Sequence, residues 1–338
     1  MALGFDAGTM NLVSCKRNDA GDLVYKREMN AFIKILIEND FMYNMMNKSA
    51  KVPLIRFEDQ KIAYALGEAA MNMAYSMPTV ELRRPMKDGC VNPKERDAFE
   101  IMKIMAHSIL SNVTKDQEVV YYSVPANAIN SETDADYHAK LLEAIFKAFK
   151  SKEGYTVNAK PINEALALVY AELESEAYTG IGISFGAGMV NLCFAIYGAP
   201  VFTFSIVNSG DWIDKQVAKA TGEPIAVVNN EKHKIDFAKE PTTNTERAIQ
   251  MQYRLMIEKT VAGIKKGLEQ NAKAKLDRPV KIVVAGGTAS PNGFEKLFKE
   301  VIESTSDLGI QVGEIVKPSE PLRSVARGCL IAAENSAS

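Results

Sequence analysis

Cysteine is scarce in this sequence, and its few copies form no recognisable site. The four cysteines among 338 residues stand far apart, at Cys15, Cys90, Cys193 and Cys329, with no CxxC pair. This spacing is typical of free buried thiols in a reducing compartment and argues against a disulfide-stapled secreted scaffold. The three histidines are equally scattered, so the sequence predicts no zinc site.

Long apolar runs and an excess of one charge are also missing. No stretch of 18 apolar residues is present, so no membrane span is predicted. No charged segment followed by an apolar stretch stands at the N-terminus, so no signal peptide is expected. A first strand starting at Ala2 leaves no room for an amphipathic helix that would anchor the chain to a membrane. Lys and Arg number 40 against 42 Asp and Glu, without a long basic run, which argues against direct binding of nucleic acid. We therefore expect a cytoplasmic protein.

Several common catalytic signatures are absent as well. The sequence has no GxxxxGK, HExxH, GxSxG or GxGxxG motif, since GIGISF at 180–185 lacks the last glycine. With 47% hydrophobic and 24% charged residues, the composition is that of a globular protein, and the length predicts about two domains.

What the sequence does contain is an internal repeat. Ala-Gly-x-x-Asn-Leu occurs at 7–12 and again at 187–192, an offset of 180 residues. Helical periodicity is found over 97–112, over 136–150 (with Ser131 and Thr133 as candidate N-caps) and over 164–174. Strands are predicted at 2–5, 12–16, 119–124, 181–185, 191–197, 201–207 and 281–285. The repeat and this mixture predict an α/β protein of two similar domains, with both repeated turns pointing into the cleft between them.

Three glycine turns, each at the end of a predicted strand, are candidates for ligand binding. In DAGT, Gly8 permits a tight turn whose backbone N–H groups can bind phosphate, and Asp6 can orient waters around Mg²⁺. FGAGMV at 185–190 offers a second phosphate turn, and AGGTASPNG at 285–293 a third turn able to lie against a flat ring. One such turn is more often structural, whereas three in this arrangement are far more specific.

The order of these turns resembles the actin, heat-shock chaperone and sugar-kinase ATPase superfamily, and most of all the prokaryotic actins of the MreB and MamK type. The resemblance continues in order through most of the chain, in RRPMKDG (83–89), SVPAN (123–127), PINEALALVYA (161–171), GDWID (210–214), NEKHKIDF (230–237) and EPLRSVARGCLIAAE (320–334). It implies a duplicated actin-like ATPase fold around a nucleotide cleft, with an inserted subdomain in each half. The implied subdomains are 1–30 with 77–155 (IA), 31–76 (IB), 156–224 with 276–338 (IIA) and 225–275 (IIB).

The same resemblance implies ATP or ADP with Mg²⁺ as ligands and assigns roles by position. Glu164 matches the acidic residue that positions the attacking water, and Asp6 the carboxylate that holds the metal through water. Without the resemblance, Glu164 reads as a charge that favours a helix N-terminus. The implied phosphate contacts are Gly8, Thr9, Met10, Asn11, Gly186, Ala187 and Gly188; the implied adenosine and ribose contacts are Glu231, Lys234, Gly286, Gly287 and Thr288.

The second turn departs from the family pattern Asp-x-Gly-Gly-Gly-Thr. Ser184 stands in place of an acid near the metal, and Met189 in place of a phosphate-binding hydroxyl. Ser184 is thus a weak metal contact at best. Loss of a charge-assisted hydrogen bond costs about 1.5–3 kcal/mol, which predicts slower hydrolysis rather than loss of nucleotide binding.

Three functions follow from these observations. The first is a filament-forming ATPase that assembles head to tail, with self-contacts at the two insertions and with unknown cargo or adaptor partners. The second is a non-polymerising adaptor of the FtsA or PilM type that uses ATP as a structural ligand, favoured by Ser184 and Met189. The third is a small-molecule kinase, for which the first half leaves little room. Filament geometry, cargo, ATP or GTP preference, and bacterial or archaeal origin stay open.

Overall fold

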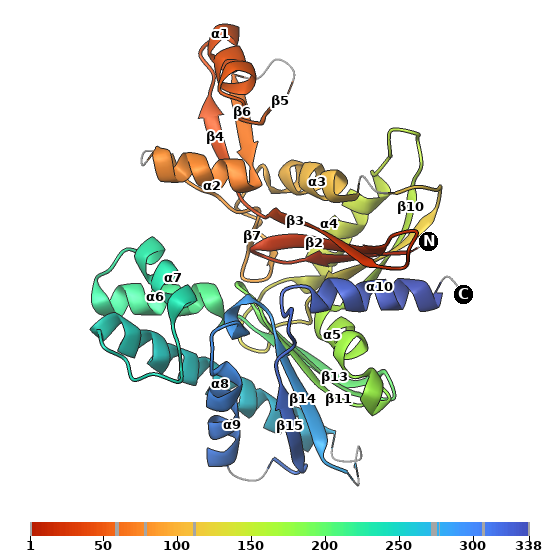
Figure 1. The fold of residues 1–338 in the computed structure, drawn as a ribbon, viewed down its shortest axis with the longest axis vertical. Coiled ribbons are helices and arrows are strands. Elements are labelled where there is room, and N and C mark those ends of the chain that lie inside the picture. Colours follow the sequence, from red (N-terminus) through yellow and green to blue (C-terminus); the bar gives the residue numbers. More distant parts are fainter. Residues whose placement is uncertain are drawn as a thin grey trace.

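Two five-stranded sheets form the centre of the molecule. The computed structural model describes residues 2–57, 61–77, 80–110, 113–271, 276, 278–305 and 308–336, without the side chain of Tyr75. The strand orders are β3-β2-β1-β9-β10 and β13-β12-β11-β14-β15. In both sheets three antiparallel strands are followed by two parallel ones, so the two halves share one topology (Figure 1). The predicted duplication is confirmed.

Every strand predicted from the sequence is present in these sheets, together with edge strands that the sequence analysis did not predict. The first sheet consists of β1 (Ala2–Ala7), β2 (Asn11–Arg17), β3 (Leu23–Met29), β9 (Glu118–Val124) and β10 (Val157–Asn163). The second consists of β11 (Gly180–Phe185), β12 (Val190–Ile196), β13 (Ala199–Ile206), β14 (Val280–Ala285) and β15 (Val312–Val316).

The register of the two hairpins differs from the register of the repeated motif. Ala7 pairs with Leu12 in the first hairpin, and Phe185 pairs with Val190 in the second. Equivalent positions are therefore 185 − 7 = 178 residues apart, not 180 as the motif has it. In this register Ser184 is the counterpart of Asp6, which is the substitution that the family comparison pointed to.

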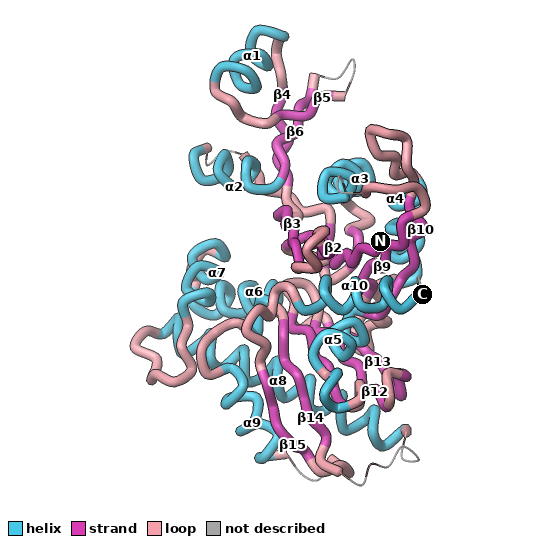
Figure 2. The backbone as a smooth tube through the Cα atoms, turned by 45° about the vertical axis from the view of Figure 1, so that its right-hand side comes forward, coloured by secondary structure: helices cyan, strands magenta, loops and turns pink. Residues whose placement is uncertain are grey.

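Helices cover the outer faces and fill the space between the sheets. The core of the first half joins its sheet to α3 (Ala98–Ile109) and α4 (Ala135–Lys147), and that of the second joins its sheet to α8 (Asn244–Gln270) and α9 (Phe294–Ser304). Between the sheets, α5 (Glu164–Glu172) packs against α10 (Ser324–Ser336) (Figures 1 and 2). The predicted N-caps of α4 are wrong, because the Asp134 side chain accepts the hydrogen bond from the N–H of Tyr137. Residues 111–112 of the predicted helix 97–112 lie outside the described residues.

Equivalent glycines let these two central helices approach the sheets closely. A Cβ on Gly4 of β1 would lie 2.1 Å from the carbonyl oxygen of Ala326 in α10. A Cβ on Gly182, its counterpart in β11, would lie 2.8 Å from the carbonyl oxygen of Ala165 in α5. Any larger residue would separate helix from sheet at both places, so these glycines fix the spacing of the two halves.

Each half also carries additional elements at its side. In the first half, β4 (Phe32–Leu36), β5 (Leu54–Arg56) and β6 (Ile62–Leu66) form a small sheet with α1 (Asp40–Asn44), a π-helical turn (Met45–Ser49) and α2 (Gly67–Ser76), and a short hairpin joins β7 (Met86–Lys87) to β8 (Cys90–Val91). The small sheet projects at the top of Figure 1. In the second half, α6 (Gly210–Thr221) and α7 (Ile225–Lys234) pack with α8. The four subdomain boundaries stay a prediction, and 58–60 and 272–275 within the insertions lie outside the described residues.

Candidate functional site

A cavity of about 690 Å³ lies where the three glycine turns meet. This volume is within the range of small-molecule sites. Asp6, Glu164 and Ser184 line it together with 8–11, 186–189 and 286–288. Nearly all the residues selected from the sequence are thus brought to one cavity, although they come from opposite ends of the chain.

The first turn is held from behind by a residue that the sequence analysis missed. The side-chain amide of the buried Asn30 donates to the carbonyl oxygen of Gly8 over 3.1 Å, and its backbone N–H donates to that of Met10 over 2.8 Å. A Cβ on Gly8 would lie 2.6 Å from the carbonyl oxygen of Asn11, so the turn needs glycine there. These contacts leave the turn rigid, with its edge facing the cavity.

The second and third turns are tied to each other. The carbonyl oxygen of Gly186 accepts hydrogen bonds from the hydroxyls of Ser209 (2.5 Å) and Thr288 (2.7 Å). Thr288, which the resemblance assigned to adenosine, therefore uses its hydroxyl to position the second turn. Gly286 has φ of +93°, and a Cβ there would lie 2.4 Å from the carbonyl oxygen of Phe185, so only glycine fits.

The first and second turns touch each other across the cavity. A Cβ on Gly188 would lie 2.5 Å from the Thr9 hydroxyl and 2.3 Å from the backbone nitrogen of Gly89. Met189 is only 2% exposed, and a Cβ on Gly89 would lie 2.4 Å from its Cγ. The methionine that replaces a hydroxyl in the family pattern thus seals the contact between the two halves.

Asp6 lies at the end of β1 beside a serine of the neighbouring strand β9. The Ser123 hydroxyl donates to Asp6 Oδ1 over 2.8 Å and itself accepts the N–H of Ala7 over 2.9 Å. Burial raises the pKa of Asp6 to about 6, while the hydrogen bond from Ser123 lowers it in part. The carboxylate is thus oriented by Ser123 and faces the cavity.

Glu164 begins α5, where the Asn163 side chain caps the helix by accepting the N–H groups of Ala165 and Leu166. The Asn191 amide donates to Glu164 Oε2 over 2.8 Å. Burial raises the pKa of Glu164 to about 8, and the charge of Asp6 adds to the increase. Hydrogen bonds from Ser184 and Asn191 act in the opposite direction. The two carboxyl groups are therefore close enough to oppose each other's ionisation.

Asn191 connects Glu164 to the junction between the two halves. Its amide oxygen accepts the hydroxyl of Ser205 on β13, over 2.5 Å. The backbone of Ser205 pairs with the loop after β9: the N–H of Ile129 donates to its carbonyl oxygen over 2.9 Å. Asn191 stands inside the repeated motif, so the repeat was the available signal, although the sequence analysis assigned this residue no role.

Helix α7 presents a different face to the cavity than the resemblance implied. Ala226, Asn229, Asn230 and His233 line the cavity, at the i, i+3, i+4, i+7 spacing of one helical face. Glu231 and Lys234 instead line a second cavity, of about 420 Å³, with residues of the segment 235–250. The structure does not bring this pair to the three glycine turns.

The family of the chain follows from its match to one family model. A family model described as Volactin matches residues 1–333. The chain belongs to the Volactin family. No curated protein matches it.

Solved structures show which fold this Volactin family member shares. A MamK double helical filament is 16% identical, covers 98% of each chain and has a TM-score of 0.69. A non-polymerising MamK mutant bound to AMPPNP has 16% identity, 98% coverage of each chain and a TM-score of 0.58. The ethanolamine utilization protein EutJ from Carboxydothermus hydrogenoformans is 16% identical over 98% of this chain and 89% of its own, with a TM-score of 0.53. The chain has the actin-like ATPase fold.

The described residues contain no group of three or more His, Cys, Asp or Glu side chains that could hold a metal ion. No helix in the described ranges is long and apolar enough to cross a membrane.

Proposed function

We propose that this protein binds ATP with Mg²⁺ in the cavity between its two halves, polymerises head to tail and hydrolyses the nucleotide slowly. The observation that carries this proposal is the pair of facing glycine turns with Asp6 and Glu164 between them, in one cavity of about 690 Å³. Backbone N–H groups of two such turns suit a polyphosphate chain. The likeness to a MamK filament supports self-assembly, and that to a MamK mutant bound to AMPPNP supports a nucleotide ligand.

The donor set fits a hydrated magnesium ion better than a protein-built metal cage. Asp6 is a carboxylate at the cavity with one oxygen held by Ser123, and Ser184 contributes a hydroxyl that bonds Glu164. Mg²⁺ keeps several waters when it is bound with phosphates, so one carboxylate suffices to hold it through water. Such an ion would neutralise phosphate charge, and its affinity would be lowered because position 184 lacks an acid.

Glu164 would align the attacking water. It starts a helix, its Oε2 is fixed by Asn191, and it lies next to Asp6. Since phosphoryl transfer depends mainly on positioning and electrostatics, a fixed carboxylate at this point can orient the water in line with the terminal phosphate. For the ribose, we favour Asn230 and His233 over Glu231 and Lys234, because only the former pair lines this cavity.

The test is ATP·Mg-dependent sedimentation read alongside phosphate release, for the native chain and Glu164→Ala. Polymer with slow phosphate release, and longer-lived polymer in the variant, is the expected result. No polymer with any nucleotide would contradict the filament.

An adaptor that keeps ATP as a structural ligand is the second candidate. It is favoured by Ser184 in the place of an acid and by Met189, which fills the turn with an apolar contact against Gly89. Nucleotide binding without polymer or phosphate release in the same assay would support it.

A further inference from the structure

One cation on the wall of the cavity has no role in the function proposed so far. Arg27 of β3 lines the cavity and is exposed. Its guanidinium makes no hydrogen bond or ion pair with any other described residue. Lys232, the other lysine or arginine in the described lining, is already occupied: its Nζ lies 2.7 Å from Asp214 Oδ1 and donates to the carbonyl oxygen of Gly210.

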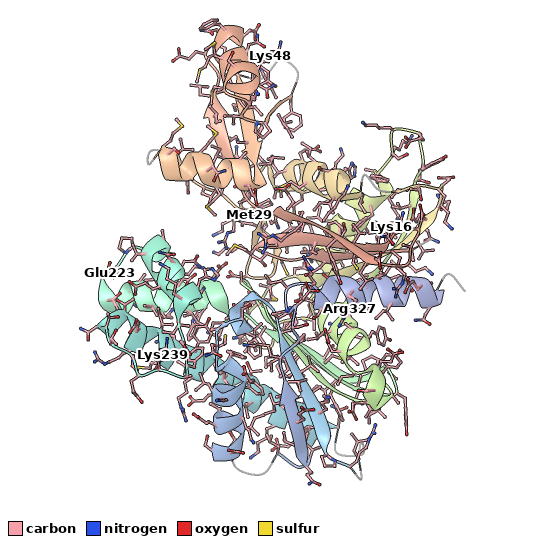
Figure 3. The ribbon with its side chains drawn as sticks, in the orientation of Figure 1. Lys16, Met29, Lys48, Glu223, Lys239 and Arg327 are labelled. Carbon is pink, nitrogen blue, oxygen red and sulfur yellow. The ribbon has the colours of Figure 1, made fainter. Side chains whose placement is uncertain are left out.

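The strand register places Arg27 in one row with Asp6. Asp6 pairs with Val13 on β2, and Val13 pairs with Arg27 on β3. Directly opposed residues in antiparallel strands point to the same face, so all three side chains share the face that borders the cavity. Two strand spacings separate Arg27 from Asp6 by about 10 Å. Met29, labelled in Figure 3, is two residues further along the same strand and lines the same cavity.

The equivalent row in the second half explains why Arg27 is left unpaired. There Ser184 pairs with Asn191 and Asn191 with Ser205. Ser184 and Asn191 each form a hydrogen bond with Glu164, and Asn191 also accepts the hydroxyl of Ser205. In the first half the middle position is the apolar Val13, which offers Arg27 no acceptor. The guanidinium is therefore available to a ligand in the cavity.

We propose that Arg27 binds the phosphate chain of the nucleotide, on the side away from Glu164. This inference rests on the proposed function. In the first sheet, β10 leads directly into Glu164, whereas β3 is the opposite edge, with Asp6 on β1 between them. If Glu164 faces the terminal phosphate, Arg27 faces the phosphates that stay with the product. A guanidinium binds phosphate oxygens through paired hydrogen bonds, and this contact survives hydrolysis.

Equilibrium binding of ATP, ADP and adenosine to the full chain tests this placement. The variants are Arg27→Gln, Arg27→Lys and, as a matched control, Lys26→Gln, which makes the same charge change at the preceding residue of β3, on the opposite face of the sheet. We expect Arg27→Gln to bind ATP and ADP about tenfold more weakly and adenosine as the native chain does. Arg27→Lys should be intermediate, and Lys26→Gln unchanged.

The contrary outcomes are distinct. If the native chain binds ATP and the ATP affinity of Arg27→Gln agrees with it within about twofold, Arg27 makes no contact with the phosphates. Arg27 is then a charge on an edge strand that only discourages pairing with the sheet of another molecule. If Arg27→Gln weakens ATP but not ADP, the residue faces the terminal phosphate and the placement is wrong. If the native chain binds no nucleotide, the proposed function itself fails. Melting temperatures of the variants show whether each is folded.

Discussion

Arg84 and Asp211 join the two halves of the molecule through a forked contact. Arg84 Nη1 lies 2.9 Å from Asp211 Oδ1 and 3.0 Å from Oδ2. Arg84 precedes β7 in the first half, and Asp211 stands in the first turn of α6 in the second, where its N–H donates to the carbonyl oxygen of Ala187. The ion pair thus holds the second glycine turn against the first half.

Breaking this pair should loosen the closed arrangement of the halves. Arg84→Gln removes a half-buried ion pair worth about 1 kcal/mol, so we expect nucleotide to dissociate roughly fivefold faster. Stopped-flow displacement of a fluorescent nucleotide measures this rate. Arg56→Gln, which breaks an ion pair between β5 and Asp40 of α1, is the control and should leave the dissociation rate unchanged. Equal rates in both variants would show that the pair does not limit opening.

Removing the amide that fixes Glu164 should slow hydrolysis more than binding. In Asn191→Ala the carboxylate loses its 2.8 Å donor, and misplacement of a positioning group can cost ~10- to 100-fold in rate. We expect phosphate release to fall by that factor while ATP affinity stays within ~3-fold. Asn335→Ala on α10, far from the cavity, is the amide-loss control. A native rate in Asn191→Ala would mean that Glu164 does not need this contact.

An acidic residue at position 184 should make the stability of the protein depend on Mg²⁺. Ser184→Asp places a third carboxyl beside Asp6 and Glu164, whose pKa values are already raised. We expect the free energy of unfolding of the unliganded variant to fall by about 1 kcal/mol or more, which lowers its melting temperature by ~2–4 °C. Mg²⁺ and ATP together should restore this stability. Ser131→Asp in an exposed loop is the control. A variant that is equally stable with and without Mg²⁺ would contradict a metal at this position.

The raised pKa of Glu164 predicts a pH-dependent stability of the unliganded protein. The folded state keeps a proton on this carboxyl between its ordinary pKa of 4.5 and about 8, so its contribution to stability falls as pH rises through that interval. Glu164→Gln removes the effect. The stability of the variant relative to the native chain should therefore increase by at least ~1 kcal/mol from pH 5 to pH 9, measured by urea unfolding. A constant difference between Glu164→Gln and the native chain over this pH range would contradict the raised pKa of Glu164.

The strands and turns followed from the sequence because their causes are local. Short, nearly continuous apolar runs predicted β1, β2, β11 and β12, and glycine at positions 8, 186 and 286 marked the turns, since backbone contacts or a positive φ exclude side chains there. The cap of α4 was misplaced because Ser131, Thr133 and Asp134 are all good cap residues, and only the path of the chain selects Asp134.

The partners of the two carboxyl groups could not be predicted, because they arise from pairing between distant strands. Ser123 reaches Asp6 from 117 residues away, and Asn191 reaches Glu164 from 27. A shift of two residues between the repeated motif and the hairpin register was equally invisible, although it decides that Ser184 corresponds to Asp6. Helix α7 illustrates the same limit, since either of its faces could have met the cavity.

The sequence by itself determined the duplicated α/β architecture, the three glycine turns and the acidic residue at the base of the first turn, because hydrophobic pattern and backbone freedom are properties of short segments. Only the tertiary structure decided which side chains meet in the cavity. Strand register and helix rotation determine these side-chain contacts, and both depend on packing across the whole chain. The row from Asp6 through Val13 to Arg27 is an example.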